Sequence, residues 1–171
     1  MDPSLAINLV SLLISLIALA ISAYLAHRQA SAAHGANLIP VIFNSFREWR
    51  QPDFVQTQKY ILASLSIDHD AEMGLSGIPE PLQSQIDKVA IFYDDLGKLV
   101  AYRALDWKIV VGTFGVTTVK VWAELRPFIY REREIRGTRH MACFEDLACR
   151  AKDNPPVELH KKMGLRSDPG S

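Results

Sequence analysis

The chain has 171 residues with 19 basic and 19 acidic side chains, so its formal net charge is zero. Zero net charge gives no general attraction to polyanions, and the sequence carries no strong nucleic-acid signal. The two cysteines, Cys143 and Cys149, form neither a CxxC pair nor a zinc-ligand spacing, which argues against zinc-binding and disulfide-rich classes. They are expected to be structural thiols in a reducing compartment.

The first predicted element is a transmembrane helix over residues 5–26. This stretch holds 22 residues without a charged side chain, and a helix of about that length crosses the roughly 30 Å hydrocarbon core of a bilayer. A cleaved signal peptide would have a positive start and a shorter apolar core, whereas no Lys or Arg precedes this run. A buried helix of a soluble protein would be shorter and two-faced.

The charges on either side of the run predict its orientation. Residues 1–4 carry only Asp2 and the terminal amine, while basic groups dominate the other side: His27, Arg28, Arg47 and Arg50. The positive-inside rule then places the short N-terminus outside the cell and the C-terminal domain in the cytoplasm. The predicted location is the inner (plasma) membrane, which the protein crosses once.

One face of the predicted membrane helix carries small and polar side chains at a heptad-like spacing. This seam consists of Asn8, Ser11, Ser15, Ala18 and Ser22. Helices associate in lipid through close approach at small residues and through interhelical hydrogen bonds. The seam therefore predicts another transmembrane helix as partner, from a second copy or from another protein. In the alternative interpretation, the serine hydroxyls bond back to the carbonyl one turn earlier and face lipid.

The chain beyond the membrane is predicted to be all-helical. Residues 27–39 form a connector that continues the helix for a turn or two and ends near Gly35 and Asn37. A cytoplasmic domain over residues 40–152 begins with a helix opened by Pro40, and Pro52 then starts another that runs to about Ser66. Residues 67–81 contain two glycines and two prolines and are predicted to be a loop.

Three further helices complete the predicted domain. Residues 82–100 follow helical spacing, and Gly97 within them marks a close contact or a bend. Residues 107–129 contain many β-branched side chains that would suit a hairpin, but apolar spacing and Asp106 as N-cap favour a helix. Pro127 then kinks or restarts this helix, which stops at Gly137. Thr138 caps a last helix, and residues 153–171 form a disordered tail.

The resulting fold class is all-α, with one N-terminal transmembrane helix followed by a cytoplasmic bundle of about five or six helices. In this architecture the chain resembles a family of short bacterial membrane-anchored proteins known only as a domain of unknown function. The stretches that carry the resemblance, between Leu5 and about Ala151, are FREWRQPDF, FYDDLG, ALDW, VWAELRPFIYRERE and FEDLA. The resemblance implies a bacterial inner-membrane protein with a helical cytoplasmic domain, and it assigns no catalytic residue.

Few residues point to chemistry. Asp68, Asp70 and Glu72 alternate like the start of a calcium loop, but Met73 stands where glycine is needed and Pro79 where a bidentate Glu belongs. His69 has no second ligand at a metal-binding spacing. Neither a metal nor a cofactor is therefore expected. Arg133 and His140 faintly resemble the Arg-spacer-His arrangement of all-helical ribonucleases, in which His serves as general acid or base.

The first functional hypothesis is a single-pass membrane-anchored interaction protein, an adaptor or accessory subunit that also can self-associate. Its partners are the lipid bilayer and a second transmembrane helix. The alternatives are a membrane-tethered ribonuclease-like effector that uses Arg133 and His140, and a membrane protein that senses a small ligand. Phosphate-loop, HExxH and GxSxG motifs are not found in the sequence, so there is no positive reason to predict an enzyme.

Overall fold

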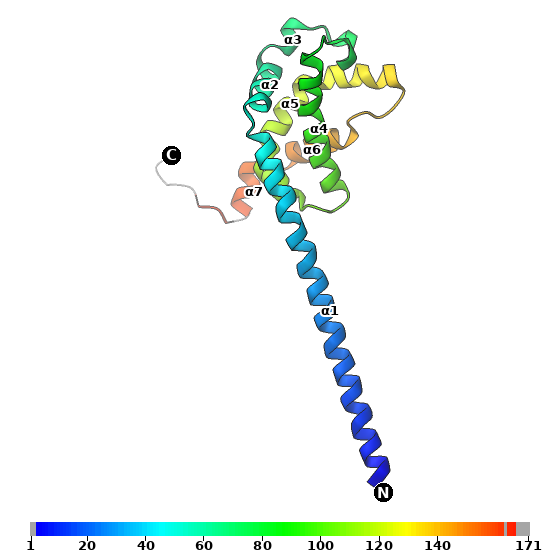
Figure 1. The fold of residues 1–171 in the computed structure, drawn as a ribbon. Coiled ribbons are helices and arrows are strands. Elements are labelled where there is room, and N and C mark those ends of the chain that lie inside the picture. Colours follow the sequence, from blue (N-terminus) through cyan, green and yellow to red (C-terminus); the bar gives the residue numbers. More distant parts are fainter. Residues whose placement is uncertain (1–2, 163, 167–171) are drawn as a thin grey trace. The chain divides into compact units, whose positions relative to one another are not determined.

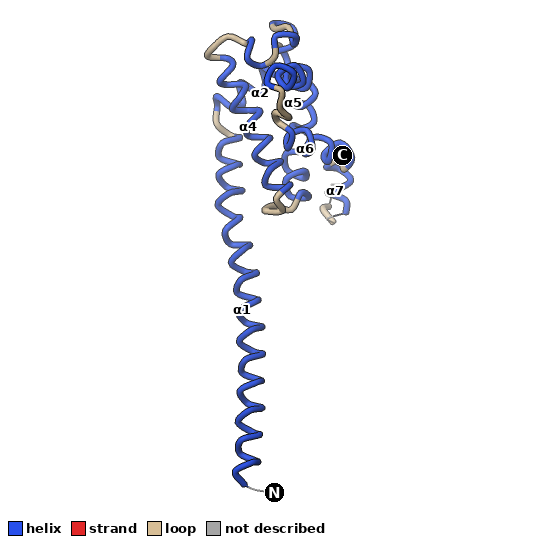
Figure 2. Tube along the Cα trace, turned by 90° about the vertical axis from the view of Figure 1, so that its right-hand side faces the viewer, coloured by secondary structure: helices blue, strands red, loops and turns tan. Residues whose placement is uncertain are grey.

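The computed structural model describes residues 3–162 and 164–166, and the side chains of 3, 5–10, 27, 29–39 and 41–42 lie outside the described set. The described chain is helical, with no strand (Figures 1 and 2). The helices are α1 (Pro3–Trp49), α2 (Pro52–Ala63), α3 (Leu65–Asp68), α4 (Leu82–Ala101), α5 (Trp107–Arg136), α6 (Ala142–Asp153) and α7 (Pro156–Lys162), with 3₁₀ turns η1 (Ala71–Met73) and η2 (Leu75–Gly77). The chain forms two compact units, Met1–Asn44 and Ser45–Ser171.

Helix α1 continues without a break through the stretch predicted to be a connector. The predicted end near Gly35 and the new start at Pro40 were wrong, because Pro40 lies inside α1. The run from residue 29 to residue 36 is rich in alanine, the strongest helix former, and this outweighs the cost of about 1 kcal/mol for one glycine. A proline removes a single backbone hydrogen bond, and the helix can continue on both sides of it.

The membrane span predicted for residues 5–26 is not supported by the described residues. Among them, no helix combines the length and the hydropathy that crossing a bilayer requires.

The core of the second unit is an aromatic cluster between α4, α5 and α6. The ring of Tyr93 on α4 stacks on Phe144 of α6 with centroids 5.1 Å apart, and Trp122 of α5 meets Phe144 edge-on at 5.0 Å. The apolar stripe predicted for α4 is confirmed, since Ile86, Val89, Tyr93 and Leu96 are buried. Burial raises the pKa of Tyr93 to about 12.

Helices α4 and α6 approach each other closely at Gly97. A Cβ atom built on Gly97 would overlap the backbone carbonyl of Cys143. The prediction that Gly97 marks a close contact is therefore confirmed.

Helix α5 confirms the helical interpretation of residues 107–129 and excludes the hairpin. Asp106 caps its start, accepting a hydrogen bond from the Lys108 N–H at 2.9 Å, and Gly137 ends it in the left-handed conformation with φ of 64°. The helix continues through Pro127 without restarting. Burial of Leu125 and Phe128 on either side holds it in place, because tertiary packing overrides local propensity.

Helix α6 begins at Ala142 rather than after the predicted cap Thr138. Met141 at its N-cap has φ of 56° and makes no capping bond of its own. The cap comes instead from α4, where one carboxylate oxygen of Asp94 accepts hydrogen bonds from the N–H groups of Cys143 at 3.0 Å and Phe144 at 2.9 Å. An acceptor supplied by a distant helix leaves no signal next to the helix it caps.

The predicted disordered tail contains a packed helix. In α7, Leu159 is only 4% exposed, and the His160 ring nitrogen lies 3.0 Å from the carbonyl oxygen of Gly112 on α5. A glycine on α5 leaves the space that α7 occupies, since a Cβ atom built on Gly115 would lie only 3.2 Å from the side chain of Pro156. The prediction failed because one buried leucine in a short polar helix gives little local pattern.

Candidate functional site

The predicted seam lies on an exposed part of α1. Ser11, Ser15, Ala18 and Ser22 are all exposed, and the side chain of Asn8 lies outside the described residues. The Ser15 hydroxyl donates to the backbone carbonyl of Ser11 at 2.8 Å. In the single chain, Ser15 thus makes the back-bond of the alternative interpretation. That bond leaves the seam's small residues free to face another helix.

Arg133 is fixed by its own chain. Its Nε donates to the carbonyl of His140 at 2.7 Å, one terminal nitrogen donates to Glu145 at 2.8 Å, and the other donates to the carbonyl of Met141 at 3.3 Å. The Tyr130 hydroxyl also donates to Glu145, at 2.7 Å. Burial alone would raise the pKa of Glu145, but the bonds from Tyr130 and Arg133 lower it. Arg133 therefore anchors the connection from α5 to α6.

The structure brings Arg133 and His140 together through a backbone carbonyl rather than around a shared cavity. The imidazole of His140 instead interacts electrostatically with the charged side chains of Arg136, Glu132 and Asp87. Burial and the Arg136 charge lower the pKa of His140, while burial raises the pKa of Asp87. An acid and a base with displaced pKa values are typical of functional sites, and also of structural ion-pair networks.

Glu132 on α5 is a buried carboxylate. Its side chain on α5 is 1% exposed, accepts a hydrogen bond from the Ser76 N–H at 2.9 Å, and pairs with Arg136. Burial alone would raise the pKa of Glu132, but the bonds from Ser76 and Arg136 lower it. Gly74, with φ of 69°, passes so close that an added Cβ would lie 2.8 Å from Glu132. Glu132 therefore fixes the loop between α3 and α4.

The acidic residues of that loop do not gather around a metal. Asp70 accepts a hydrogen bond from the Glu72 N–H at 3.0 Å and so caps η1. Tyr60 donates to Asp68 at 3.1 Å. Within the described ranges, no three potential metal-ligating side chains come together.

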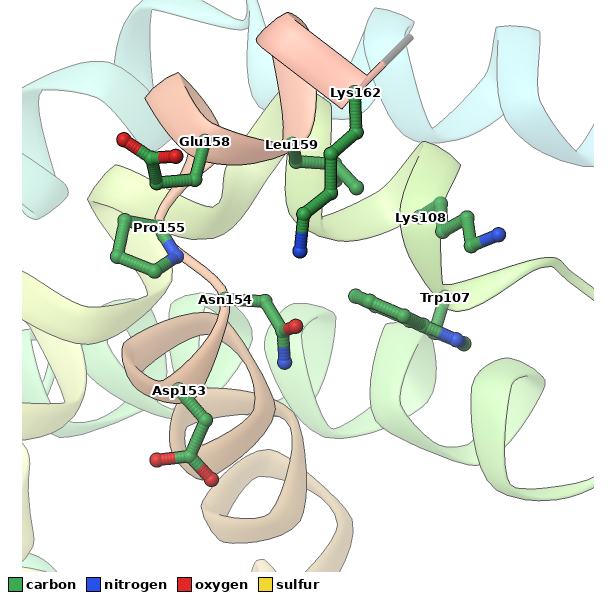
Figure 3. A pocket seen from close by; sticks show the side chains of 8 residues that line it. All are labelled: Trp107, Lys108, Asp153, Asn154, Pro155, Glu158, Leu159 and Lys162. Carbon is green, nitrogen blue, oxygen red and sulfur yellow. The ribbon is translucent and has the colours of Figure 1, made fainter.

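A cavity of about 430 Å³ opens between the first turn of α5 and the segment that joins α6 to α7. Its walls include Trp107 and Lys108 from α5, and Asn154, Leu159 and Lys162 from the C-terminal segment. In Figure 3 the indole of Trp107 and the amine of Lys162 project toward the same space. The sequence does not predict this cavity, because six of its eight lining residues belong to the stretch predicted to be disordered.

A family model described as a domain of unknown function, DUF4760, matches residues 6–151. The chain belongs to the DUF4760 family. No curated protein and no solved structure matches it. The predicted resemblance to a domain of unknown function is thus confirmed, while the match does not bear on the bacterial origin or on the membrane anchor.

The DUF4760 match covers all the candidate residues of the hydrogen-bonded network but only part of the cavity. Asp94, Glu132, Arg133, His140 and Glu145 all fall inside it. Each carboxylate of this group accepts hydrogen bonds that fix a loop or a helix end, so the network can hold the domain together without a ligand. The cavity is shared, because Trp107 and Lys108 lie inside the DUF4760 match whereas α7 lies beyond its last residue.

Proposed function

We propose that this DUF4760 protein is a single-pass membrane-anchored interaction protein, an adaptor or accessory subunit of a membrane complex. Residues 5–26 cross the bacterial inner membrane with the N-terminus outside, and the helical domain lies in the cytoplasm. The seam pairs with a second transmembrane helix, from another copy or from a partner protein.

The observation that carries the proposal is the exposure of apolar side chains along α1. Between Leu12 and Leu25, nine large hydrophobic side chains are each 50–68% exposed. They lie on all sides of the helix, so a single neighbouring helix could not cover them. Extended apolar surface of this kind marks a membrane or protein interaction site. Lipid around the helix would remove this surface from water, at a gain of roughly 25 cal/mol per Å².

The sequence supplies the rest of the support. The uncharged run extends from Leu5 to Ala26, although its described side chains begin at Ser11. Basic residues follow the run, at Arg28, Arg47 and Arg50, which favours the proposed orientation.

The ribonuclease alternative has less geometric support. All three guanidinium nitrogens of Arg133 already donate to Glu145 or to backbone carbonyls of the α5–α6 connection. These bonds use three of its five N–H groups, so at most two remain for a phosphate. The ligand-sensing alternative has a specific observation in its favour, the cavity beside Trp107.

Adding bulk to the seam tests the proposed helix pairing. Ser15→Leu should weaken association of the full chain in mild detergent by roughly fivefold, because interhelical contacts in membranes are worth about 1 kcal/mol each. Ala20→Leu is the matched control, since it adds a leucine about 140° away around the helix. Light scattering after size exclusion, together with identification of proteins that co-purify from native membranes, gives the readout. If Ser11, Ser15 and Ser22 all become leucine and the associated state is unchanged, the pairing proposal is wrong.

A further inference from the structure

The cavity between α5 and α7 has apolar walls on opposite sides. Trp107 forms one wall, and Pro155 and Leu159 form the other (Figure 3). Helix α7 is held against α5 by the contact between His160 and Gly112 at 3.0 Å, so the second wall is part of the packed bundle. Ligand pockets for small molecules typically range from about 300 to 1,000 Å³ and combine apolar walls with a few polar groups. At about 430 Å³, this cavity can hold one small molecule with a flat ring.

Lys162 brings a positively charged group into the cavity from the C-terminal segment. The amine of Lys162 projects toward the indole of Trp107, while the carboxylates of Asp153 and Glu158 lie on the far side (Figure 3). Glu158 pairs with Lys161 at 3.3 Å, and Lys162 has no acidic partner among the described side chains. The amine of Lys162 is therefore available to an anion.

Asn154 contributes a hydrogen-bond acceptor. Its side-chain nitrogen donates to the Arg150 carbonyl at 3.0 Å, which fixes the orientation of the amide. The amide oxygen makes no hydrogen bond within the described part of the chain, and Figure 3 shows it on the side of Trp107. An N–H group on the edge of a bound ring could donate to this oxygen.

From these groups we infer that the cavity binds a small anion carried on a flat nitrogen heterocycle. The ring stacks on Trp107, an N–H on its edge donates to Asn154, and its phosphate or carboxylate pairs with Lys162. Nucleoside monophosphates and indole carboxylates share this chemistry. The inference concerns the helical domain alone and does not depend on whether α1 crosses a membrane.

Calorimetric titration of the full chain in mild detergent tests the site with four compounds. Adenosine 5′-monophosphate and indole-3-acetate carry both the ring and the anion, whereas adenosine and inorganic phosphate carry one each. At least one of the first two should bind, and each half-compound should bind at least tenfold more weakly than the complete compound that binds more tightly. Which of the two complete compounds binds more tightly tells a nucleotide site from a carboxylate site.

Two substitutions assign the binding to the cavity. Trp107→Leu and Lys162→Gln should each weaken binding roughly tenfold or more, since stacking on one aromatic side chain accounts for about that factor. Trp107→Phe, which keeps a ring, should retain part of the affinity. Lys120→Gln is the matched charge control, because it lies on α5 about 18 Å along the helix from Lys108.

Three outcomes would overturn the inference. The first is the absence of binding by all four compounds at millimolar concentration. The second is equal binding of inorganic phosphate and adenosine monophosphate, which would remove any role for the ring. The third is binding that Trp107→Leu and Lys162→Gln leave unchanged while circular dichroism shows both variants folded.

Discussion

Two long helices of this chain, α5 and α1, differ in how far their apolar side chains are exposed. On α5, Val111, Val121, Leu125 and Ile129 are completely buried by the rest of the bundle. On α1, the leucines and isoleucines from Leu12 to Leu25 are all at least half exposed. The bundle covers most of the apolar side chains of α5, whereas the described part of the chain leaves these side chains of α1 exposed. Apolar content alone therefore does not tell a helix covered by its own bundle from one that the rest of the chain leaves exposed, whereas the number of apolar faces does.

The largest expected effect comes from deleting the same side chain on each helix. Leu125→Ala should lower the free energy of unfolding of the bundle by about 3 kcal/mol, because it leaves a cavity in a fully buried site. Leu16→Ala on α1 should change it by less than about 0.5 kcal/mol, since that side chain is exposed. Chemical unfolding of the full chain in detergent, followed by tryptophan fluorescence, measures both. Equal losses would remove the contrast between the two helices.

A smaller effect is expected at Asp94, where α4 supplies the cap of α6. Asp94→Ala should cost about 2 kcal/mol, because two N–H groups at the start of α6 lose their acceptor. Asp95→Ala is the matched control: among the described residues its exposed carboxylate pairs with Lys98 alone, so the loss should stay below about 0.5 kcal/mol. Thermal unfolding monitored by near-ultraviolet circular dichroism compares the two. An Asp95→Ala loss as large as that of Asp94→Ala would contradict the capping role.

The smallest effect is a pH dependence confined to the bundle. The folded pKa of His140 lies below its ordinary value, so the unfolded chain takes up a proton first as the pH falls through about 6.5. The contribution of His140 to the free energy of unfolding is fully present above that pH and is lost as the pH falls below it. His140→Gln should therefore flatten the decline in unfolding free energy between about pH 7.5 and pH 5.5.

Asp87 contributes to the pH dependence with the opposite sign, because its folded pKa is raised and its protonated form favours the fold at lower pH.

Unfolding curves in denaturant at a series of pH values, for the wild type and for His140→Gln, measure the slope of the unfolding free energy against pH. Identical slopes in the two proteins would show that His140 keeps an ordinary pKa in the fold.

Local signals predicted α4 and α5 well and the ends of α6 and α7 poorly. Asp106 and Gly137 lie directly at the two ends of α5, and the stripe from Ile86 to Leu96 repeats with helical spacing, so neighbouring residues sufficed. The start of α6 depends on Asp94, which lies 49 residues before Cys143 in the sequence. Helix α7 depends on space left by Gly112 and Gly115 on α5. The cavity could not be predicted for the same reason, since six of its eight lining residues belong to this C-terminal segment.

Flotation of membranes from cells that produce the full chain tests the membrane anchor most directly. After an alkaline carbonate wash, which removes peripheral proteins, the chain should float with the lipid and be released only by detergent, while a variant lacking residues 5–26 should not float. Recovery of the intact chain in the carbonate supernatant would contradict the account.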